Sequence, residues 1–173
     1  MTTAARPPDS GKPAAEQPLA VRARVSDVPE IFRLIQYWAD ETSAVLPRTE
    51  GEIYESLRDF IVVRAGGKVI AAGALHIEGK DLAEVKSLVV DPDVQTSGLG
   101  RVIVEACLDE AVALELRTVF ALTTSPGFFE KLGFHRAAVA SFPRKVWNEC
   151  FRCSKYENCD EVAFSIDLRD RLG

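Results

Sequence analysis

The most informative stretch of this chain is residues 89–101, VVDPDVQTSGLGR. An apolar run typical of a strand stops at Asp91-Pro92, and the glycines Gly98 and Gly100 open a long segment with helical periodicity. The first turn of a helix carries unpaired N–H groups and the positive end of the helix dipole, so it can bind a pyrophosphate without a metal. Glycines let the backbone approach phosphate oxygens closely. Because Gly-Lys-Ser/Thr and a third glycine are missing, the stretch is neither a Walker loop nor a dinucleotide-binding fingerprint.

The sequence on either side of this stretch predicts an α/β chain. The N-terminal part predicts a strand over 19–25, helices over 26–40 and 49–58, and strands over 60–64, 69–77 and 82–90. The turn signals between the last three strands predict an antiparallel meander. The C-terminal part predicts a helix over 98–116, a strand over 119–122, a short helix over 126–132, a strand from Phe134 and a last strand over 161–168.

Composition narrows the class of protein. A chain of 173 residues with 47% hydrophobic content suits one compact domain, which we place at residues 19–173. A net charge of −5 argues against a nucleic-acid partner, and no apolar run is long enough to span a membrane. Residues 1–18 are rich in Pro, Ala and charge and have no apolar core of a signal peptide. We therefore expect a disordered tail and a cytoplasmic protein.

Two motifs carry a resemblance to a known family. Residues 95–100, QTSGLG, match the Gln/Arg-x-x-Gly-x-Gly/Ala motif of GNAT acetyltransferases, and residues 128–134, FFEKLGF, resemble the aromatic-aromatic-x-Lys-x-Gly-Phe signature of that family. The resemblance covers about residues 19–168. It implies a GNAT fold, in which a central, mixed, mostly antiparallel twisted sheet is flanked by helices on both faces. It also implies acetyl-CoA as co-substrate and no metal.

In that family the loop amides hold the pyrophosphate of coenzyme A, and the pantetheine arm lies along the preceding strand. The resemblance thus implies that coenzyme A is bound by Leu88, Val89, Val90, Gln95, Thr96, Ser97, Gly98, Leu99, Gly100 and Arg101. A backbone N–H near Val89 would polarise the thioester carbonyl. Many members are dimers, which makes a homodimer a candidate assembly.

A narrower resemblance concerns the acceptor. Residues 83–90, 119–124 and 47–49 are similar to the acetyltransferase domain of N-acetylglutamate synthases, and residues 145–163 are similar to short, single-domain members of that group. This implies direct acetyl transfer, in a ternary complex, to the α-amino group of L-glutamate, the first step of arginine biosynthesis. The alternatives are another small-molecule amine, a protein terminus, or a non-catalytic acetyl-CoA-binding regulatory module.

Glu84 is the candidate general base. An amine must be uncharged to attack a thioester, and a carboxylate on a central strand is rare unless it has a partner or a function. Glu84 and Lys86 would share one face of the strand, so a structural ion pair between them is the alternative. The resemblance implies that Thr123 helps Glu84 to order a water that removes the proton; otherwise Thr123 is an ordinary β-branched strand residue. Because Phe128-Phe129 cannot donate a proton, the thiolate is protonated by solvent or leaves as the anion.

The candidate acceptor-binding residues are Arg48, Lys86 and Ser87. An arginine can clamp a carboxylate with two hydrogen bonds, although a solvated loop cation is the alternative for Arg48. Long synthases use an Arg and a Ser near the C-terminal strand, where this chain has residues 159–161, Cys-Asp-Glu. A basic side chain at residues 144–145 could compensate.

Three cysteines cluster late in the chain. Cys150 and Cys153 have the spacing of half a zinc site, and Cys159 follows, but a fourth ligand is missing nearby. Buried free thiols are the alternative, and a disulfide is disfavoured in a reducing compartment. We predict no stoichiometric metal and expect this segment to fold over the acceptor pocket. His76 and His135 are expected to be structural or exposed.

Overall fold

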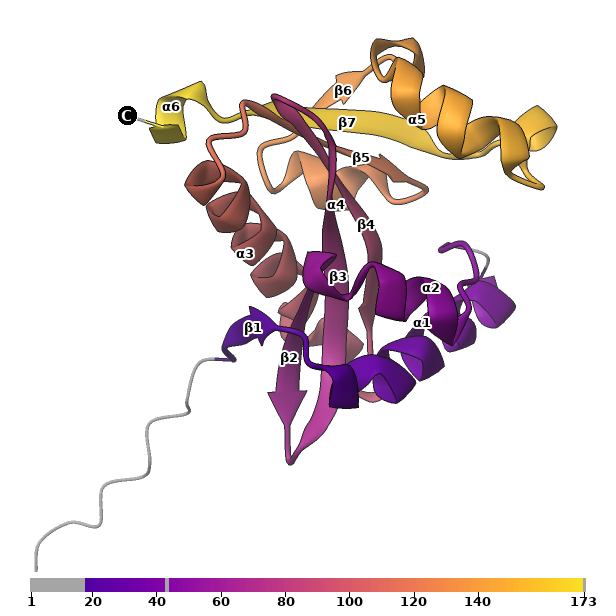
Figure 1. The fold of residues 1–173 in the computed structure, drawn as a ribbon, viewed down its shortest axis with the longest axis vertical. Helices are drawn as coiled ribbons and strands as arrows, with labels where there is room; N and C mark the ends of the chain where they lie inside the picture. The colour runs from indigo at the N-terminus through magenta and orange to yellow at the C-terminus, as the bar shows by residue number, and fades with distance from the viewer. Residues whose placement is uncertain (1–17, 43, 173) are drawn as a thin grey trace, which may run out of the picture.

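The computed structural model describes residues 18–42 and 44–172, so the expected tail lies outside the described residues except for its last position. The described chain forms one seven-stranded sheet in the order β1-β2-β3-β4-β5-β7-β6. Its strands are β1 (Ala20–Arg22), β2 (Phe60–Ala65), β3 (Lys68–Gly79), β4 (Leu82–Val90), β5 (Thr118–Thr123), β6 (His135–Ala137) and β7 (Val162–Asp167). The β4–β5 pair is parallel, whereas the other neighbouring pairs in the described chain are antiparallel. The predicted mixed, mostly antiparallel sheet is confirmed, and Figure 1 shows its strong twist.

Helices cover both faces of this sheet (Figure 1). They are α1 (Val28–Thr42), α2 (Glu50–Glu55), α3 (Leu99–Ala113), α4 (Pro126–Glu130), α5 (Pro143–Asn148) and α6 (Arg169–Leu172). Alternate residues of each strand point to opposite faces, so the sheet has two cores. One core packs Val63 and Leu75 against Ile103 of α3, and the other packs Val62 and Ala72 against α1 and α2. None of the described helices is long and apolar enough to cross a membrane.

The predicted antiparallel meander is formed by β2, β3 and β4. Gly66 and Gly67 make its first turn with φ values of 56° and 79°, a conformation that glycine adopts readily and that matches the twist of a two-residue hairpin. The predicted bounds of the third strand, 82–90, agree with β4. The helix after the glycine-bearing loop is α3, which ends earlier than predicted because Leu114 caps it and Glu115 has a left-handed φ of 58°.

The first strand is shorter than predicted. Residues Val25–Asp27 form a 3-10 turn rather than the end of a strand, because the buried Asp27 carboxylate accepts a hydrogen bond from Arg24 N at 2.6 Å. Arg64 on β2 also binds this carboxylate, with Nε donating to Oδ1 at 2.9 Å and Nη2 donating to Oδ2. The helix predicted over 26–40 therefore begins later than expected, with α1 starting at Val28.

The segment between β6 and β7 has no predicted element and is built from short pieces. It contains the 3-10 turns Val139–Ser141, Cys150–Arg152 and Tyr156–Asn158 around α5. The rings of Phe142 and Phe120 stack at 4.0 Å between centroids, which anchors the start of α5 to β5. Pieces this short carry no readable hydrophobic period.

Candidate active site

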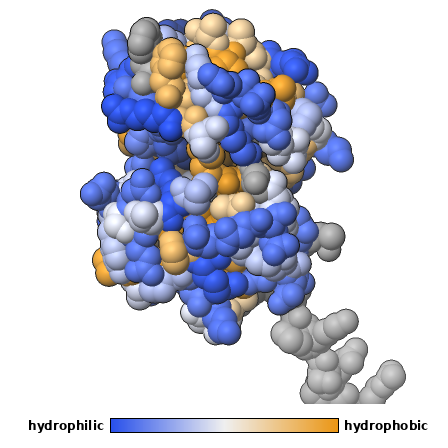
Figure 2. All heavy atoms as spheres, turned by 90° about the vertical axis from the view of Figure 1, so that its right-hand side faces the viewer, coloured by the Kyte–Doolittle hydropathy of each residue, from blue (hydrophilic) through white to orange (hydrophobic). Residues whose placement is uncertain are grey.

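One cavity opens where β4 and β5 separate. The two strands pair only from Leu82↔Thr118 to Glu84↔Phe120, and beyond these pairs both strands line a cavity of about 1180 Å³. This volume exceeds the roughly 300–1,000 Å³ of a typical small-molecule pocket, so the cavity has room for two substrates. Figure 2 shows a waist across this face of the molecule, where apolar side chains are exposed between two hydrophilic lobes.

At one end of the cavity lies the start of α3. Gly98 caps the helix in the left-handed conformation, with φ 79°. Gln95, Gly98, Gly100 and Arg101, four of the residues predicted to bind coenzyme A, line the cavity. A Cβ on Gly100 would lie 3.4 Å from the ring of Phe128, at the edge of ordinary van der Waals contact, so Gly100 packs closely against this ring. The open first turn of α3 fits a pyrophosphate.

Leu99, which was also predicted to bind coenzyme A, differs from the four residues that line the cavity. Leu99 is 3% exposed and belongs to the core beneath α3, so it offers only its backbone to a ligand. Thr96 and Ser97 lie in the 3-10 turn Pro92–Ser97, and their side chains fall outside the described part of the chain.

A β-bulge on β4 shapes the middle of the cavity. Ala72 pairs with Val89 and Ala74 with Lys86, so Ser87 and Leu88 together face Gly73, and Ser87 has φ 52°. A bulge interrupts the ladder and re-aims backbone and side chains. Only glycine fits at position 73, because a Cβ there would lie 2.6 Å from Ile103 Cγ2.

The predicted pantetheine strand lies along the same wall. Leu88, Val89 and Val90 all line the cavity. Trp38 of α1 also lines it, and its indole Nε1 donates to the carbonyl of Val90 at 2.7 Å. The sequence showed Trp38 only as an apolar position of a helix, and nothing in the pattern pointed to this contact.

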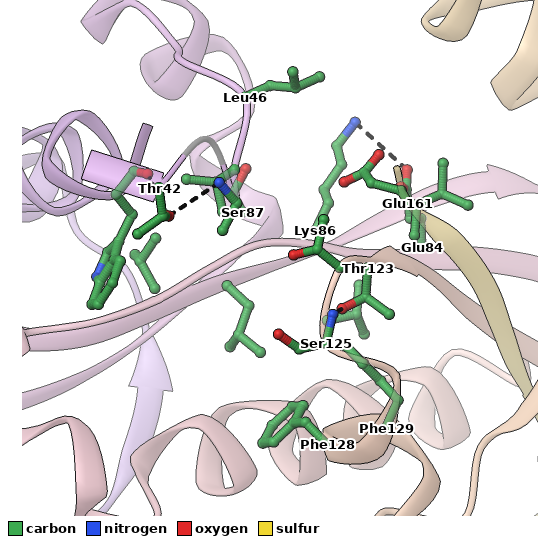
Figure 3. Close-up of a pocket in the computed structure, with 18 of the residues that line it drawn as sticks. Thr42, Leu46, Glu84, Lys86, Ser87, Thr123, Ser125, Phe128, Phe129 and Glu161 are labelled. Atoms are coloured by element: carbon green, nitrogen blue, oxygen red, sulfur yellow. Dashed lines mark hydrogen bonds and ion pairs between the residues drawn. The ribbon is translucent and has the colours of Figure 1, made fainter. Parts of the chain in front are cut away.

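Four charged side chains meet at the other end of the cavity. Lys145 Nζ lies 2.9 Å from Glu84 Oε2 and 2.5 Å from Glu149 Oε2. Lys86 Nζ lies 2.7 Å from Glu149 Oε1 and 3.9 Å from Glu84 Oε2. Figure 3 shows Lys86 reaching over the strand toward the Glu84 carboxylate, with Glu161 beside it. We call Glu84, Lys86, Lys145 and Glu149 the charge quartet.

The two carboxylates of the quartet have pKa values shifted in opposite directions. Glu84 is 2% exposed, and desolvation raises its pKa despite the opposing pull of Lys145 and Lys86. Its Oε2 is fully buried, and the contact with Lys145 lacks the alignment of a good hydrogen bond. Burial also opposes the ionisation of Glu149, but hydrogen bonds from both lysines lower its pKa to about 2. Burial would lower the pKa of Lys145, yet the two carboxylates raise it to about 12. Within the quartet, Glu84 is therefore the group suited to accept a proton.

The other predicted acceptor residues also reach the cavity. Arg48 is half-buried rather than solvated, with its guanidinium 5.9 Å from the centroid of Phe60 and Nη1 donating to Ser56 Oγ at 3.3 Å. Ser87 and Thr123 line the cavity, and Thr123 Oγ1 accepts from Ser125 N at 2.9 Å. The Thr123 hydroxyl can still donate its proton.

The two basic residues proposed to compensate for the missing Arg differ. Arg144 is exposed and is not among the cavity-lining residues, whereas Lys145 is 7% exposed and lines the cavity. Glu149 was not predicted as a site residue. Its spacing of four from Lys145, which places both on one helix face, was the available signal.

The cysteine segment covers this end of the cavity, as expected. Cys150, Cys153 and Cys159 all line it with free thiols, and burial raises the pKa of the Cys150 thiol. Among the described residues, the sulfur atoms of these cysteines do not belong to any group of three or more metal-ligand atoms that lie within 4.8 Å of one another. The geometry therefore gives no support to the zinc-site alternative.

Comparisons with known proteins agree with this geometry. The "Acetyltransferase (GNAT) family" profile matches residues 26–134. An uncharacterized N-acetyltransferase from Chlorobaculum tepidum is 37% identical over 143 residues, covering 82% of this chain and 90% of that protein. An amino-acid acetyltransferase from Mycobacterium tuberculosis is 34% identical over 149 residues, covering 84% and 83%. The chain spans only 28% of the longer amino-acid acetyltransferase from Pasteurella multocida.

Solved structures show the same fold. A Mycobacterium tuberculosis protein in complex with CoA and NLQ has a TM-score of 0.74 at 28% identity, covering 87% of this chain and 99% of that one. N-acetylglutamate synthase from Neisseria gonorrhoeae, complexed with coenzyme A and N-acetyl-glutamate, has a TM-score of 0.78 at 21% identity, covering 90% and 36%. Because the profile matches residues 26–134 and two relatives above 30% identity cover most of it, the chain belongs to the GNAT family of acetyltransferases.

Proposed function

We propose that this GNAT acetyltransferase transfers the acetyl group of acetyl-CoA directly to the α-amino group of L-glutamate in a ternary complex. The observation that carries the proposal is the buried carboxylate of Glu84, set between an anion-binding turn and three cationic side chains in one cavity. Relatives named amino-acid acetyltransferase, and the fold shared with N-acetylglutamate synthase, support an amino-acid acceptor. The reaction would be the first step of arginine biosynthesis.

The donor end would be held by backbone and helix rather than by charge pairs. The N-terminal N–H groups of α3, around Gly98 and Gly100, would bind the pyrophosphate, and Leu88 to Val90 would flank the pantetheine arm. Bound acetyl-CoA supplies the acetyl group as an activated thioester. A backbone N–H near Val89, at the end of the bulge, would stabilise negative charge that develops on the carbonyl oxygen.

Glu84 would remove the proton that the acceptor ammonium must lose before it attacks. It would accept this proton directly or through a water that the Thr123 hydroxyl helps to position, since both side chains line the cavity. As the new N–C bond forms, the nitrogen releases a second proton to solvent, and the C–S bond breaks with its electron pair going to the thiolate. Phe128 and Phe129 cannot protonate it, so that proton would come from solvent.

Cationic side chains would recognise the two carboxylates of glutamate. Lys86 and Lys145 contact Glu84, so they would bind the carboxylate next to the reacting amine. Arg48 lies on the loop before α2 and would bind the distal carboxylate, with the Ser87 hydroxyl as a further donor.

A thiol-release assay with matched acceptors tests this function. Acetyl-CoA would be offered with glutamate, glutamine, aspartate, lysine, a polyamine and a peptide with a free N-terminus. We expect the highest kcat/KM with glutamate, and N-acetyl-glutamate as the product by mass spectrometry. Faster transfer to a polyamine or peptide would reject the amino-acid assignment. Tight acetyl-CoA binding without thiol release from any acceptor would indicate a regulatory module instead.

A further inference from the structure

The carboxylate of Glu149 bridges two lysines at the acceptor end of the cavity. Oε1 contacts Lys86 Nζ at 2.7 Å, and Oε2 contacts Lys145 Nζ at 2.5 Å. Each oxygen thus engages a separate ammonium group, which is the way an amino-acid carboxylate would be bound between them. Glu149 itself lines the cavity.

These two lysines are half of the cationic groups that the cavity offers. Among the described residues that line it, the basic ones are Arg48, Lys86, Arg101 and Lys145. Arg101 stands at the phosphate-binding turn, which leaves three cations for an acceptor. Glu149 occupies two of these three, so an acceptor carboxylate must compete with it.

Glu149 is also the member of the quartet that can leave most easily. Its side chain is 36% exposed, whereas those of Lys86, Lys145 and Glu84 are 12%, 8% and 3% exposed. It follows the last residue of α5, so its side chain can turn toward solvent without unwinding the helix. The buried lysines need an anion beside them, which an arriving carboxylate would supply in place of Glu149.

We propose that Glu149 is an internal occupant of the site for the acceptor α-carboxylate, and that the amino acid displaces it on binding. The assignment to the α-carboxylate follows from Glu84. This proposed base lies 2.9 Å from Lys145, and the reacting amine shares one carbon with the α-carboxylate. A carboxylate between the lysines would therefore place the amine beside Glu84. This inference rests on the proposed function, and it makes Glu149 a determinant of acceptor affinity.

The variant Glu149→Ala tests the inference, with three acceptors that differ in one group. Glutamate has both carboxylates, glutamine has only the α-carboxylate, and isoglutamine has only the distal one. If the lysines are free of Glu149 in about one molecule in ten, the apparent KM is about tenfold above its intrinsic value. We expect Glu149→Ala to lower KM for glutamate and glutamine by about tenfold, with a smaller change in kcat. The KM for isoglutamine should stay nearly constant.

Control variants separate displacement from a general charge effect. Glu157→Ala removes an exposed glutamate from the same segment, away from the cavity lining, and should leave every KM unchanged. Glu149→Gln keeps the side-chain volume but offers a carbonyl oxygen to only one lysine, so its KM values should fall between those of Glu149→Ala and the parent. It also decides the question if Glu149→Ala fails to fold.

Three results would overturn the inference. An unchanged or higher KM for glutamate and glutamine would mean that Glu149 is a fixed counter-ion of the lysines. A fall in KM for glutamate and isoglutamine, but not for glutamine, would mean that Glu149 occupies the site of the distal carboxylate rather than that of the α-carboxylate. If the parent protein acetylates no α-amino acid, the proposed function and this inference fail together, whereas the first two results leave the proposed function intact.

Discussion

Glu84→Gln is the most direct test of the proposed base. The substitution keeps the size of the side chain and removes its ability to accept a proton. Because the carboxylate is 2% exposed and burial raises its pKa, no bulk water can easily replace it at this position. Loss of a positioned base lowers turnover by about 10²–10⁴-fold, or about 2.7–5.4 kcal/mol in the activation free energy. In the variant, the Lys145 ammonium retains its contact with the Glu149 carboxylate at 2.5 Å and so is not left without a counter-ion. We therefore expect the variant to fold and to bind acetyl-CoA.

The pH dependence of this variant discriminates between catalytic and structural roles. In the parent, kcat should fall as the pH drops through the raised pKa of Glu84, above the 4.5 of an ordinary glutamate. In Glu84→Gln this limb should vanish, and the rate should keep rising with pH as free amine becomes more abundant. The difference in kcat between Glu84→Gln and the parent would then become smaller at high pH. A deficit of constant size at every pH, in thiol-release assays with saturating substrates, would refute the assignment.

Three further predictions concern the phosphate turn, the clamp and the fold. Gly98→Asp should weaken acetyl-CoA binding in calorimetry far more than Gly98→Asn does. Both side chains tolerate the left-handed φ of 79°, but only Asp repels phosphate. Equal losses of acetyl-CoA affinity in the two variants would point to backbone strain instead. Arg48→Ala should raise the KM of glutamate far more than that of acetyl-CoA, and a parallel rise of both would mean that it supports the fold. Asp27→Ala should lower the free energy of unfolding by about 2 kcal/mol in denaturant titrations at neutral pH, since it removes the charged hydrogen-bond partner of the partly buried Arg64. Burial raises the pKa of Asp27, but the hydrogen bond from Arg64 outweighs burial and lowers this pKa below its ordinary value of 3.8. The stability that Asp27 contributes is therefore present above pH 3.8 and is lost as the pH falls below that value. If Asp27→Ala and the parent lost stability in parallel as the pH fell, this reasoning would be wrong.

Local signals explain the parts of the fold that could be predicted. Gly66-Gly67 encodes a tight hairpin, and Asp91-Pro92 ends a strand, so the meander and its bounds follow from residues that are neighbours in sequence. The same holds for the phosphate turn, where Gly98 and the start of α3 are adjacent. The strand over 19–25 was predicted too long because Arg64, nearly forty residues away, fixes Asp27 in a turn.

The charge quartet shows where sequence reasoning stops. The spacing of Glu84 and Lys86 predicts that they share one strand face, and their 3.9 Å contact agrees with it. Lys145 of α5 and Glu149, which follows that helix, join them from about sixty residues later in the chain. The start of α5 is held near β5 by the stacking of Phe142 on Phe120. No periodicity links those segments. The cytoplasmic location, the homodimer and the domain boundary at residue 19 stay predictions.

The residues that line the cavity have a consequence for how this acetyltransferase could change its acceptor. Part of the cavity lining comes from residues 139–161, beyond the 26–134 that match the family profile, and it contacts β4 through the ion pair of Glu149 with Lys86. Of the proposed acceptor residues, Arg48, Lys86 and Ser87 lie within the profile match, whereas Lys145 lies beyond it. Substitutions within residues 139–161 could therefore change acceptor preference while leaving the proposed coenzyme A loop at residues 95–101 unchanged. Part of the substrate diversity would then arise in the short elements between β6 and β7, without changes to the strands that form the two cores.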